Sequence, residues 1–231
     1  MAERKTDPGD MAEVYRRMSK LAGGEFEPDG LTTTTPGGGA SPKPVCKKSQ
    51  RELVNRLIFL GMPKVVGLSN LEFERAWDPA NAVWRLTSLE VVLLVERKVD
   101  WLSLRRLSGV VTYVDPAKSR EMEPAFGAVE SQKVVRYLTT IRLSEPGQAA
   151  SDSNWAQTSV KEALFFFLLY PEFFKDQPKR ILSLPGARIG EDVLSLGTDQ
   201  TSGRPILRSH RQSHSEPGTL VLMRSTRVVP I

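Results

Sequence analysis

The sequence predicts a single mixed-sheet domain of the α+β or α/β class with a few helices, preceded by a flexible N-terminal arm. From residue 49 onward, serine-capped segments of helical periodicity are interspersed with short β-branched runs. Residues 1–48 are instead rich in Gly, Pro, Thr and Lys, a composition that buries too little apolar surface to offset the entropy of ordering. We therefore expect an arm over 1–48 and one mixed α/β domain over 49–231.

The arm contains one segment of helical periodicity, DMAEVYRRMSKL, at about residues 10–21. Asp10 is a candidate N-cap, with Glu13 three residues later. The large apolar side chains share one helical face, which comprises Met11, Val14, Tyr15, Met18 and Leu21. An isolated helix this short is marginal in water, so the face needs a surface on which to dock. That surface belongs to another protein, to a second copy of the chain or to its own domain; transient helicity without a role is the remaining alternative.

Capping boxes predict the first helices of the domain. Ser49 and Glu52 have capping-box spacing before an apolar run that stops at Gly61. Ser69 and Glu72 repeat the pattern and predict a second helix. This second helix is expected to bury Leu71, Phe73 or its neighbours, and Trp77.

Three β-branched runs predict strands. LEVVLLVER, residues 89–97, is a continuous apolar run of the kind found in strands buried on both faces. GVVTYVD at 109–115 and KVVRYLTTIRL at 133–143 predict two more. Short apolar stretches separated by Gly, Pro and Asp then predict a strand meander at 181–184, 193–196, 205–207 and 219–223.

The stretch KEALFFFLLYPEFF, residues 161–174, carries five Phe and one Tyr. Ser159 and Glu162 form a third capping box at its start, and Pro171 disfavours helical geometry in Tyr170. The helix that ends there is apolar on nearly every face, which predicts burial on several sides. Charged residues crowd both ends and disfavour membrane insertion. A core helix is therefore favoured over an exposed interaction surface.

Cysteine content and apolar run length predict the compartment. Cys46 is the single cysteine, so no internal disulfide forms, and this usage fits a reducing cytoplasm. The N-terminal MAERKTDPGD lacks the apolar stretch of a secretory signal. The longest uncharged apolar runs reach about half of the ~20 residues that span a bilayer. We expect a cytoplasmic protein without membrane contact.

Few residues indicate chemistry. The only histidines are His210 and His214, in RSHRQSHSEPG; their spacing suits a metal pair on a helix, whereas the surrounding Ser, Gln, Pro and Gly indicate a turn. The sequence has no phosphate-loop or dinucleotide motif and no nucleophile elbow. It therefore predicts no metal site, no cofactor and no identifiable catalytic residue. A hydrolase or transferase that uses either histidine requires it to line a pocket beside a Ser, Asp or Glu.

The C-terminal segment is basic. Its candidate anion-binding residues are Arg204, Arg208, Arg211, Arg224 and Arg227. If alternate strand positions align them on one sheet face, they form a patch for nucleic acid or another polyanion. The whole chain has 32 basic and 27 acidic residues, so its net charge of +5 is a weak bias. Residues 201–231 contain no aromatic side chain on which bases could stack, and a solvated basic face is the alternative.

Three stretches, taken in order, resemble a family of uncharacterised bacterial proteins that share a domain of unknown function. The first is LIFLGMPKVVGLSNLEFERAWDP followed by VVLLVER. The second, TSVKEALFFFLLYPEFF, is similar to a family stretch in which a Thr-led helix ends in an aromatic-Pro-Glu turn. The third, ILSLPGARIGEDVLSL, is similar to a Gly-Ser-Arg-x-Gly-Asp turn before a strand. The resemblance covers most of residues 50–225 and implies a compact α/β-type domain without a particular activity.

These features favour a non-enzymatic binding or adaptor module, because chemistry-bearing residues are sparse while the arm carries an amphipathic segment. Its expected partner is another protein or a second copy of the chain. Binding of nucleic acid or another polyanion through the C-terminal arginines is the second hypothesis. Hydrolysis or group transfer through His210 or His214 is the third.

Overall fold

A computed structural model of the chain describes residues 47–77, 86–87, 89–113, 135–145, 153–176, 180–199, 201–211 and 219–231. The chain divides into two units, residues 1–38 and 39–231, and every described residue belongs to the second. The predicted arm, with its predicted helix at 10–21, lies outside the described residues except for Lys47 and Lys48. The helices and strands that follow therefore belong to the domain.

The described residues form six helices and eight strands. The helices are α2 (Gln50–Phe59), α3 (Met62–Val65), α4 (Asn70–Ala76), α5 (Trp101–Ser108), α7 (Val160–Leu169) and α8 (Pro171–Asp176). The strands are β1 (Glu90–Glu96), β2 (Val111–Tyr113), β3 (Arg136–Ser144), β4 (Trp155–Gln157), β5 (Ile181–Ile189), β6 (Asp192–Thr198), β7 (Pro205–Arg211) and β8 (Thr219–Pro230). All eight belong to one sheet with both parallel and antiparallel pairs. The predicted class, a single mixed-sheet domain with a few helices, is confirmed.

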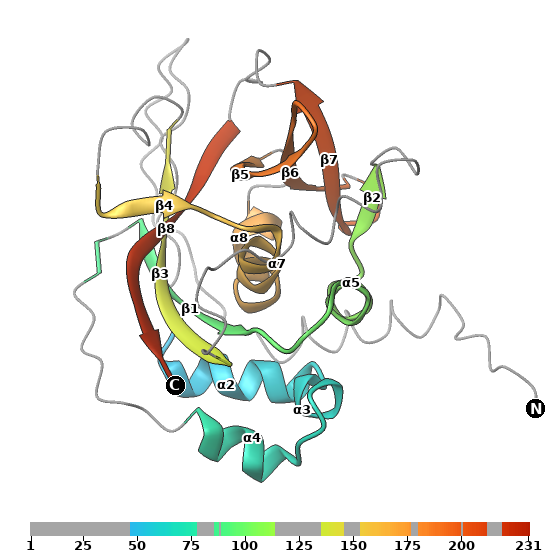
Figure 1. The fold of residues 1–231 in the computed structure, drawn as a ribbon. Helices are drawn as coiled ribbons and strands as arrows, with labels where there is room; N and C mark the ends of the chain where they lie inside the picture. The colour runs from blue at the N-terminus through green and yellow to red at the C-terminus, as the bar shows by residue number, and fades with distance from the viewer. Residues whose placement is uncertain are drawn as a thin grey trace, which may run out of the picture. The chain divides into compact units, whose positions relative to one another are not determined.

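The 12-residue strand β8 organises the sheet, whose order is β1-β3-β8-β5-β6-β7-β2 with β4 paired to β8 off this path. Near the start of β8, Val221 pairs with Ser144 of β3 and with Ser183 of β5. Further along, Arg224 pairs with β3 on one edge and with Ala156 of β4 on the other. Strands β5 and β4 therefore share the edge of β8 opposite β3. The sheet curves around α7, which lies at its centre in Figure 1.

Three helices begin at the serine capping boxes that the sequence predicts. In α2, the Ser49 hydroxyl oxygen accepts from the Glu52 backbone N–H at 3.3 Å, and the Glu52 carboxylate accepts from the Ser49 backbone N–H at 2.6 Å. Helices α4 and α7 repeat this reciprocal arrangement at Ser69 and Ser159. Such an N-cap stabilises a helix by about 1 kcal/mol relative to alanine. All three predicted starts are confirmed.

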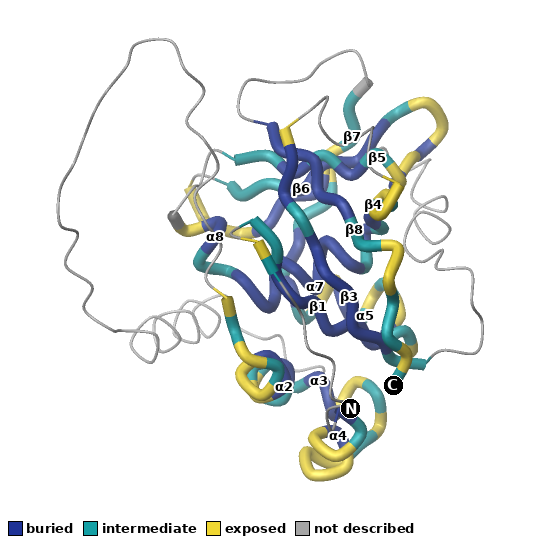
Figure 2. Tube along the Cα trace, turned by 90° about the vertical axis from the view of Figure 1, so that its left-hand side faces the viewer, coloured by how far each residue is buried: buried dark blue, intermediate teal, exposed yellow. Residues whose placement is uncertain are grey.

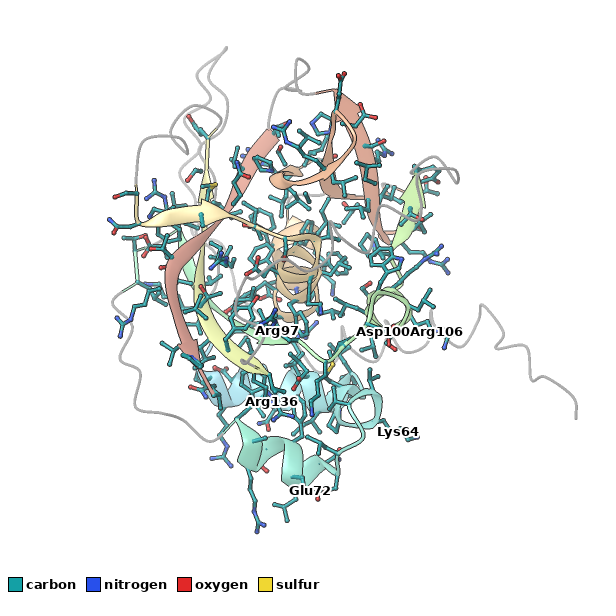
Figure 3. The ribbon with its side chains drawn as sticks, in the orientation of Figure 1. Lys64, Glu72, Arg97, Asp100, Arg106 and Arg136 are labelled. Carbon is teal, nitrogen blue, oxygen red and sulfur yellow. The ribbon has the colours of Figure 1, made fainter. Side chains whose placement is uncertain are left out.

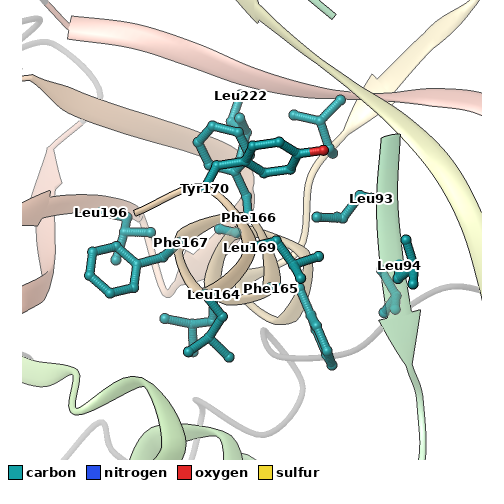
Figure 4. Packing of buried hydrophobic residues seen from close by; sticks show 14 of the residues in the cluster. Leu93, Leu94, Leu164, Phe165, Phe166, Phe167, Leu169, Tyr170, Leu196 and Leu222 are labelled. Atoms are coloured by element: carbon teal, nitrogen blue, oxygen red, sulfur yellow. The ribbon is translucent and has the colours of Figure 1, made fainter. Parts of the chain in front are cut away.

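Helix α7 is the core helix that the Phe-rich stretch predicts. Nine of its ten residues are buried, and Figure 4 shows its side chains among those of β1, β6 and β8. The ring of Phe166 lies 5.4 Å from that of Tyr170 and 5.5 Å from that of Phe173, measured between centroids. Aromatic pairs of this kind contribute about 0.5–1.5 kcal/mol beyond the burial of their area. The core therefore forms around this helix.

The C-terminal end of α7 is fixed by proline and by contacts from other elements. The helix ends at Leu169, and Pro171 begins α8, because proline disfavours helical geometry in the preceding Tyr170. The Tyr170 hydroxyl donates to the Val92 carbonyl at 2.7 Å and so satisfies a backbone acceptor of the terminal strand β1. The Lys48 ammonium donates to the Leu169 carbonyl at 2.7 Å, where the helix end carries partial negative charge.

Three expectations need correction. Leu71 is exposed, whereas Phe73 and Trp77 are buried, because helical residues two apart point to roughly opposite sides. Helix α5 lies unpredicted between β1 and β2, although Asp100 caps its start and Gly109 ends it. Strand β8 does not continue the meander of β5, β6 and β7; it pairs in parallel with β5 and antiparallel with β3.

Candidate functional site

The predicted docking face lies outside the described residues. It comprises Met11, Val14, Tyr15, Met18 and Leu21. Cys46 and His214 also lie outside them. Docking of the arm therefore stays a prediction, and the sites described next belong to the domain.

The sheet divides the candidate anion-binding arginines between two regions. Arg204 and Arg208 lie before and on β7, whereas Arg224 and Arg227 lie on β8. Strands β5 and β6 separate β7 from β8, a distance of about 14 Å at the usual strand spacing. The side chain of Arg211, at the end of β7, is not among those the structure describes. Anion binding by these arginines stays a prediction.

Arg224 is directed into the domain, where it pairs with Glu162 of α7. The Arg224 Nε lies 3.1 Å from Glu162 Oε1, and the Tyr137 hydroxyl donates to the same oxygen at 2.9 Å. Glu162 Oε2 accepts from the Ser159 N–H and hydroxyl. Burial raises the pKa of Glu162, and Arg224 opposes that shift. Burial and the neighbouring carboxylate raise the pKa of Tyr137, so its hydroxyl acts as a hydrogen-bond donor. This network ties α7 to β3 and β8.

A second group of buried charges lies beside the N-terminal turn of α7. Glu96 is fully buried, and the Arg136 Nε lies 2.5 Å from its Oε2. Figure 3 shows Arg97 and Arg136 at the same end of the β1–β3 pair. The Lys161 ammonium donates to the Arg97 carbonyl at 2.8 Å. Burial, followed by repulsion from Arg97, lowers the pKa of Lys161 to about 8. Lys161 therefore loses its proton at a lower pH than an exposed lysine does.

An exposed tyrosine meets an exposed arginine at the β2 end of the sheet. Strand β2 pairs in parallel with β7 and places Tyr113 opposite Arg208. The guanidinium carbon of Arg208 lies 5.8 Å from the centre of the Tyr113 ring, within cation–π range. The ring is 59% exposed. Sequence reasoning missed Tyr113 because no local pattern links residue 113 to β7, nearly one hundred positions later.

Exposed apolar side chains gather on α2, α3 and α4. Of the five large hydrophobic residues exposed within the described ranges, three belong to these helices, namely Phe59, Val65 and Leu71. Figure 2 shows exposed positions concentrated on α2 and α4, while the sheet and α7 are largely buried. Charged side chains of both signs, such as Lys64 and Glu72 in Figure 3, are exposed on the same helices. Exposed apolar and exposed charged side chains thus share these three helices, and protein-binding surfaces combine side chains of both kinds.

The remaining predicted chemistry centres on one histidine. His210 is half-buried on β7, opposite Val193 of β6. Within the part of the chain that the structure describes, no group of three His, Cys, Asp or Glu side chains is placed to hold a metal ion. A catalytic role for His210 stays a prediction. None of the described helices has the length and apolar character needed to cross a bilayer.

The fold defines the class of protein: an α+β domain whose mixed sheet curves around a buried helix. Comparisons with models of protein families, with curated proteins and with solved structures find no match to the chain. The resemblance to a family of uncharacterised bacterial proteins therefore stays a prediction that rests on three sequence stretches.

Proposed function

We propose that the chain is a non-enzymatic binding or adaptor module that contacts another protein through the exposed faces of α2, α3 and α4, which we call the helical surface. The observation that carries the proposal is the exposure of Phe59 (57%) and Leu71 (56%) on helices that pack against each other. Val65 on the intervening helix is exposed as well. Single apolar side chains scattered over a surface need no explanation, but a group on adjacent helices indicates a contact site.

The size of the expected effect follows from the exposure of these side chains. Full burial of a large apolar side chain contributes about 1.5–3 kcal/mol. Phe59 and Leu71 are each a little over half exposed, so a partner that covers both gains roughly that amount in total. This corresponds to about a 10- to 150-fold difference in affinity. The two residues are therefore expected to act as anchors of the contact.

Substitution of both anchors tests the proposal. The full chain is used as bait for proteins of its native cells, and each captured partner is then purified and titrated against wild type and variants. Phe59→Ser combined with Leu71→Ser is expected to weaken binding about 10- to 150-fold. Leu102→Ser, an exposed position of the same kind on α5, is the matched control and should bind as wild type does. Equal affinity of the double variant and wild type for every partner overturns the proposal.

The arm is the second part of the proposed adaptor. In this proposal the partner is another protein or a second copy of the chain, no cofactor takes part, and the module works in the cytoplasm, where Cys46 stays reduced. Removal of residues 1–24 is expected to change the set of partners or the oligomeric state measured by light scattering. If neither changes, the arm has no part in binding, while the helical surface is judged by its own variants.

A further inference from the structure

The face of the sheet that carries Arg208 points away from the core. On β7 and β6, Leu207 and Leu196 belong to the hydrophobic core, so their neighbours in sequence lie on the other face of the sheet. On that face Arg208 is exposed, whereas Ser195 is buried. The register places Ser195 of β6 opposite Arg208, and Ser183 of β5 opposite Ser195. A guanidinium group and two hydroxyl groups thus form one row across three strands, and Tyr113 extends the row onto β2.

A second row of the same outer face adds another arginine. Val193 of β6 lies opposite His210 of β7 on one edge and opposite Arg188 of β5 on the other. Arg188 is exposed, and its Nε donates to the Pro185 carbonyl at 3.3 Å. Arg188 and Arg208 stand two strands apart, a lateral distance of about 10 Å. The outer face therefore presents two exposed cations and the half-buried Ser183, whereas Val193 and Ser195 between the two arginines are buried.

Among the described residues from β5 to β7, the acidic ones are Glu191, Asp192 and Asp199. Asp192 begins β6 and pairs with Ile189 of β5, next to the position that pairs with Arg188. Glu191 lies in the turn between β5 and β6, and Asp199 lies just after β6. The backbone N–H groups of Ser202 and Thr201 lower the pKa of Asp199, and Arg208 adds a smaller effect. Asp199 therefore interacts mainly with the backbone of its own turn and only weakly with Arg208.

We propose that the accessible residues of this outer face, Tyr113, Ser183, Arg188 and Arg208, bind single-stranded nucleic acid. The Tyr113 ring stacks on an unpaired base, which is sequence-tolerant because every base has a π-face. The two guanidinium groups contact phosphates, and the hydroxyl of the half-buried Ser183 donates to a backbone oxygen. A single strand is favoured over a duplex because only an unstacked base offers its face to a protruding ring.

The proposed site differs from a patch of C-terminal arginines. Arg224 is excluded because it pairs with Glu162 inside the domain, and Arg188 from β5 takes part instead. Tyr113 supplies the aromatic ring that residues 201–231 lack. The site uses no residue of the helical surface. A negative result for nucleic-acid binding therefore does not count against the proposed adaptor function.

Fluorescence anisotropy of a labelled oligothymidylate of about twelve nucleotides, titrated with the full chain at low salt, tests the proposal. Tyr113→Ala is expected to weaken binding on the order of 5- to 150-fold, the range for the loss of one base stack, whereas Tyr113→Phe retains affinity. Arg208→Ala is expected to weaken binding and to reduce the slope of log affinity against log salt by about 0.7. Leu102→Ser, exposed on α5, is the control and should bind as wild type does.

Controls separate stacking from charge alone. Because Tyr113 is exposed, its variants should unfold thermally as wild type does, and Tyr113→Phe keeps the test valid if alanine perturbs β2. The proposal is overturned if wild type fails to bind the oligothymidylate, or if Tyr113→Ala binds it as tightly as wild type. It is also overturned if heparin, a duplex of the same length or anionic lipid vesicles bind equally well and are insensitive to Tyr113→Ala, since the face would then recognise charge only.

Discussion

Replacement of Arg224 by methionine is expected to lower the unfolding free energy by about 3–5 kcal/mol at neutral to mildly alkaline pH. Methionine fills much of the volume of the arginine stem but removes the cation that lies 3.1 Å from the Glu162 carboxylate. That carboxylate is 1% exposed, so it stays in the interior without a charged partner. A typical domain is stable by only about 5–15 kcal/mol, so the expected loss is a large fraction of the total.

The loss should depend on pH in a defined direction. Burial raises the pKa of Glu162 above its ordinary value of 4.5, and without Arg224 that pKa rises further. Between the unfolded and folded pKa values the folded state binds more protons, so the unfolding free energy falls as pH rises through that window. The unfolding free energy of Arg224→Met should therefore be closest to that of wild type near the ordinary carboxyl pKa. The difference should be largest at higher pH.

Urea unfolding of the full chain at about pH 5 and about pH 8 measures this effect. Arg227→Met, an exposed position on the same strand, is the matched control and should stay within about 0.5 kcal/mol of wild type. Adding Glu162→Gln to Arg224→Met should restore part of the stability, because no buried charge remains. A pH-independent loss below about 1 kcal/mol in Arg224→Met would refute the reasoning, since Glu162 would then need no cationic partner.

Two further predictions concern other contacts. A Cβ on Gly186 would lie 2.7 Å from the Gln157 Cβ, so Gly186→Ala should force β4 and β5 apart. The unfolding free energy measured in urea should fall by about 1–3 kcal/mol. Unchanged stability would mean that β4 moves aside without cost. Folding lowers the pKa of Lys161 from 10.5 to about 8, mainly through burial. The unfolded state therefore binds more protons between these values, and this lysine makes stability rise with pH there. In Lys161→Met, the unfolding free energy should no longer rise with pH between about 8 and 10.5. Lys64→Met, at an exposed position on α3, should keep that rise.

The sequence by itself determined the elements whose signals are local. The boxes at Ser49, Ser69 and Ser159 act between residues three positions apart, so their donors and acceptors meet in any context that permits a helix. Pro171 ends α7 through its own ring and the preceding residue. The apolar character of α7 and of β1 likewise required burial, whatever surrounds them. The fold class follows from these elements together.

Only the tertiary structure decided which distant residues meet, and the candidate sites depend on those meetings. Arg208 was identifiable from sequence as a candidate anion ligand, but its neighbour Tyr113 was not, because their pairing depends on where β2 joins the sheet. Arg224 lies on the same basic segment, yet the register of β8 turns it toward Glu162. Strand alternation predicts that alternate residues of one strand share a face of the sheet. Whether that face packs against a buried carboxylate or is exposed to water depends on the order of the strands. That order depends on contacts between residues far apart in the chain, which local periodicity does not specify.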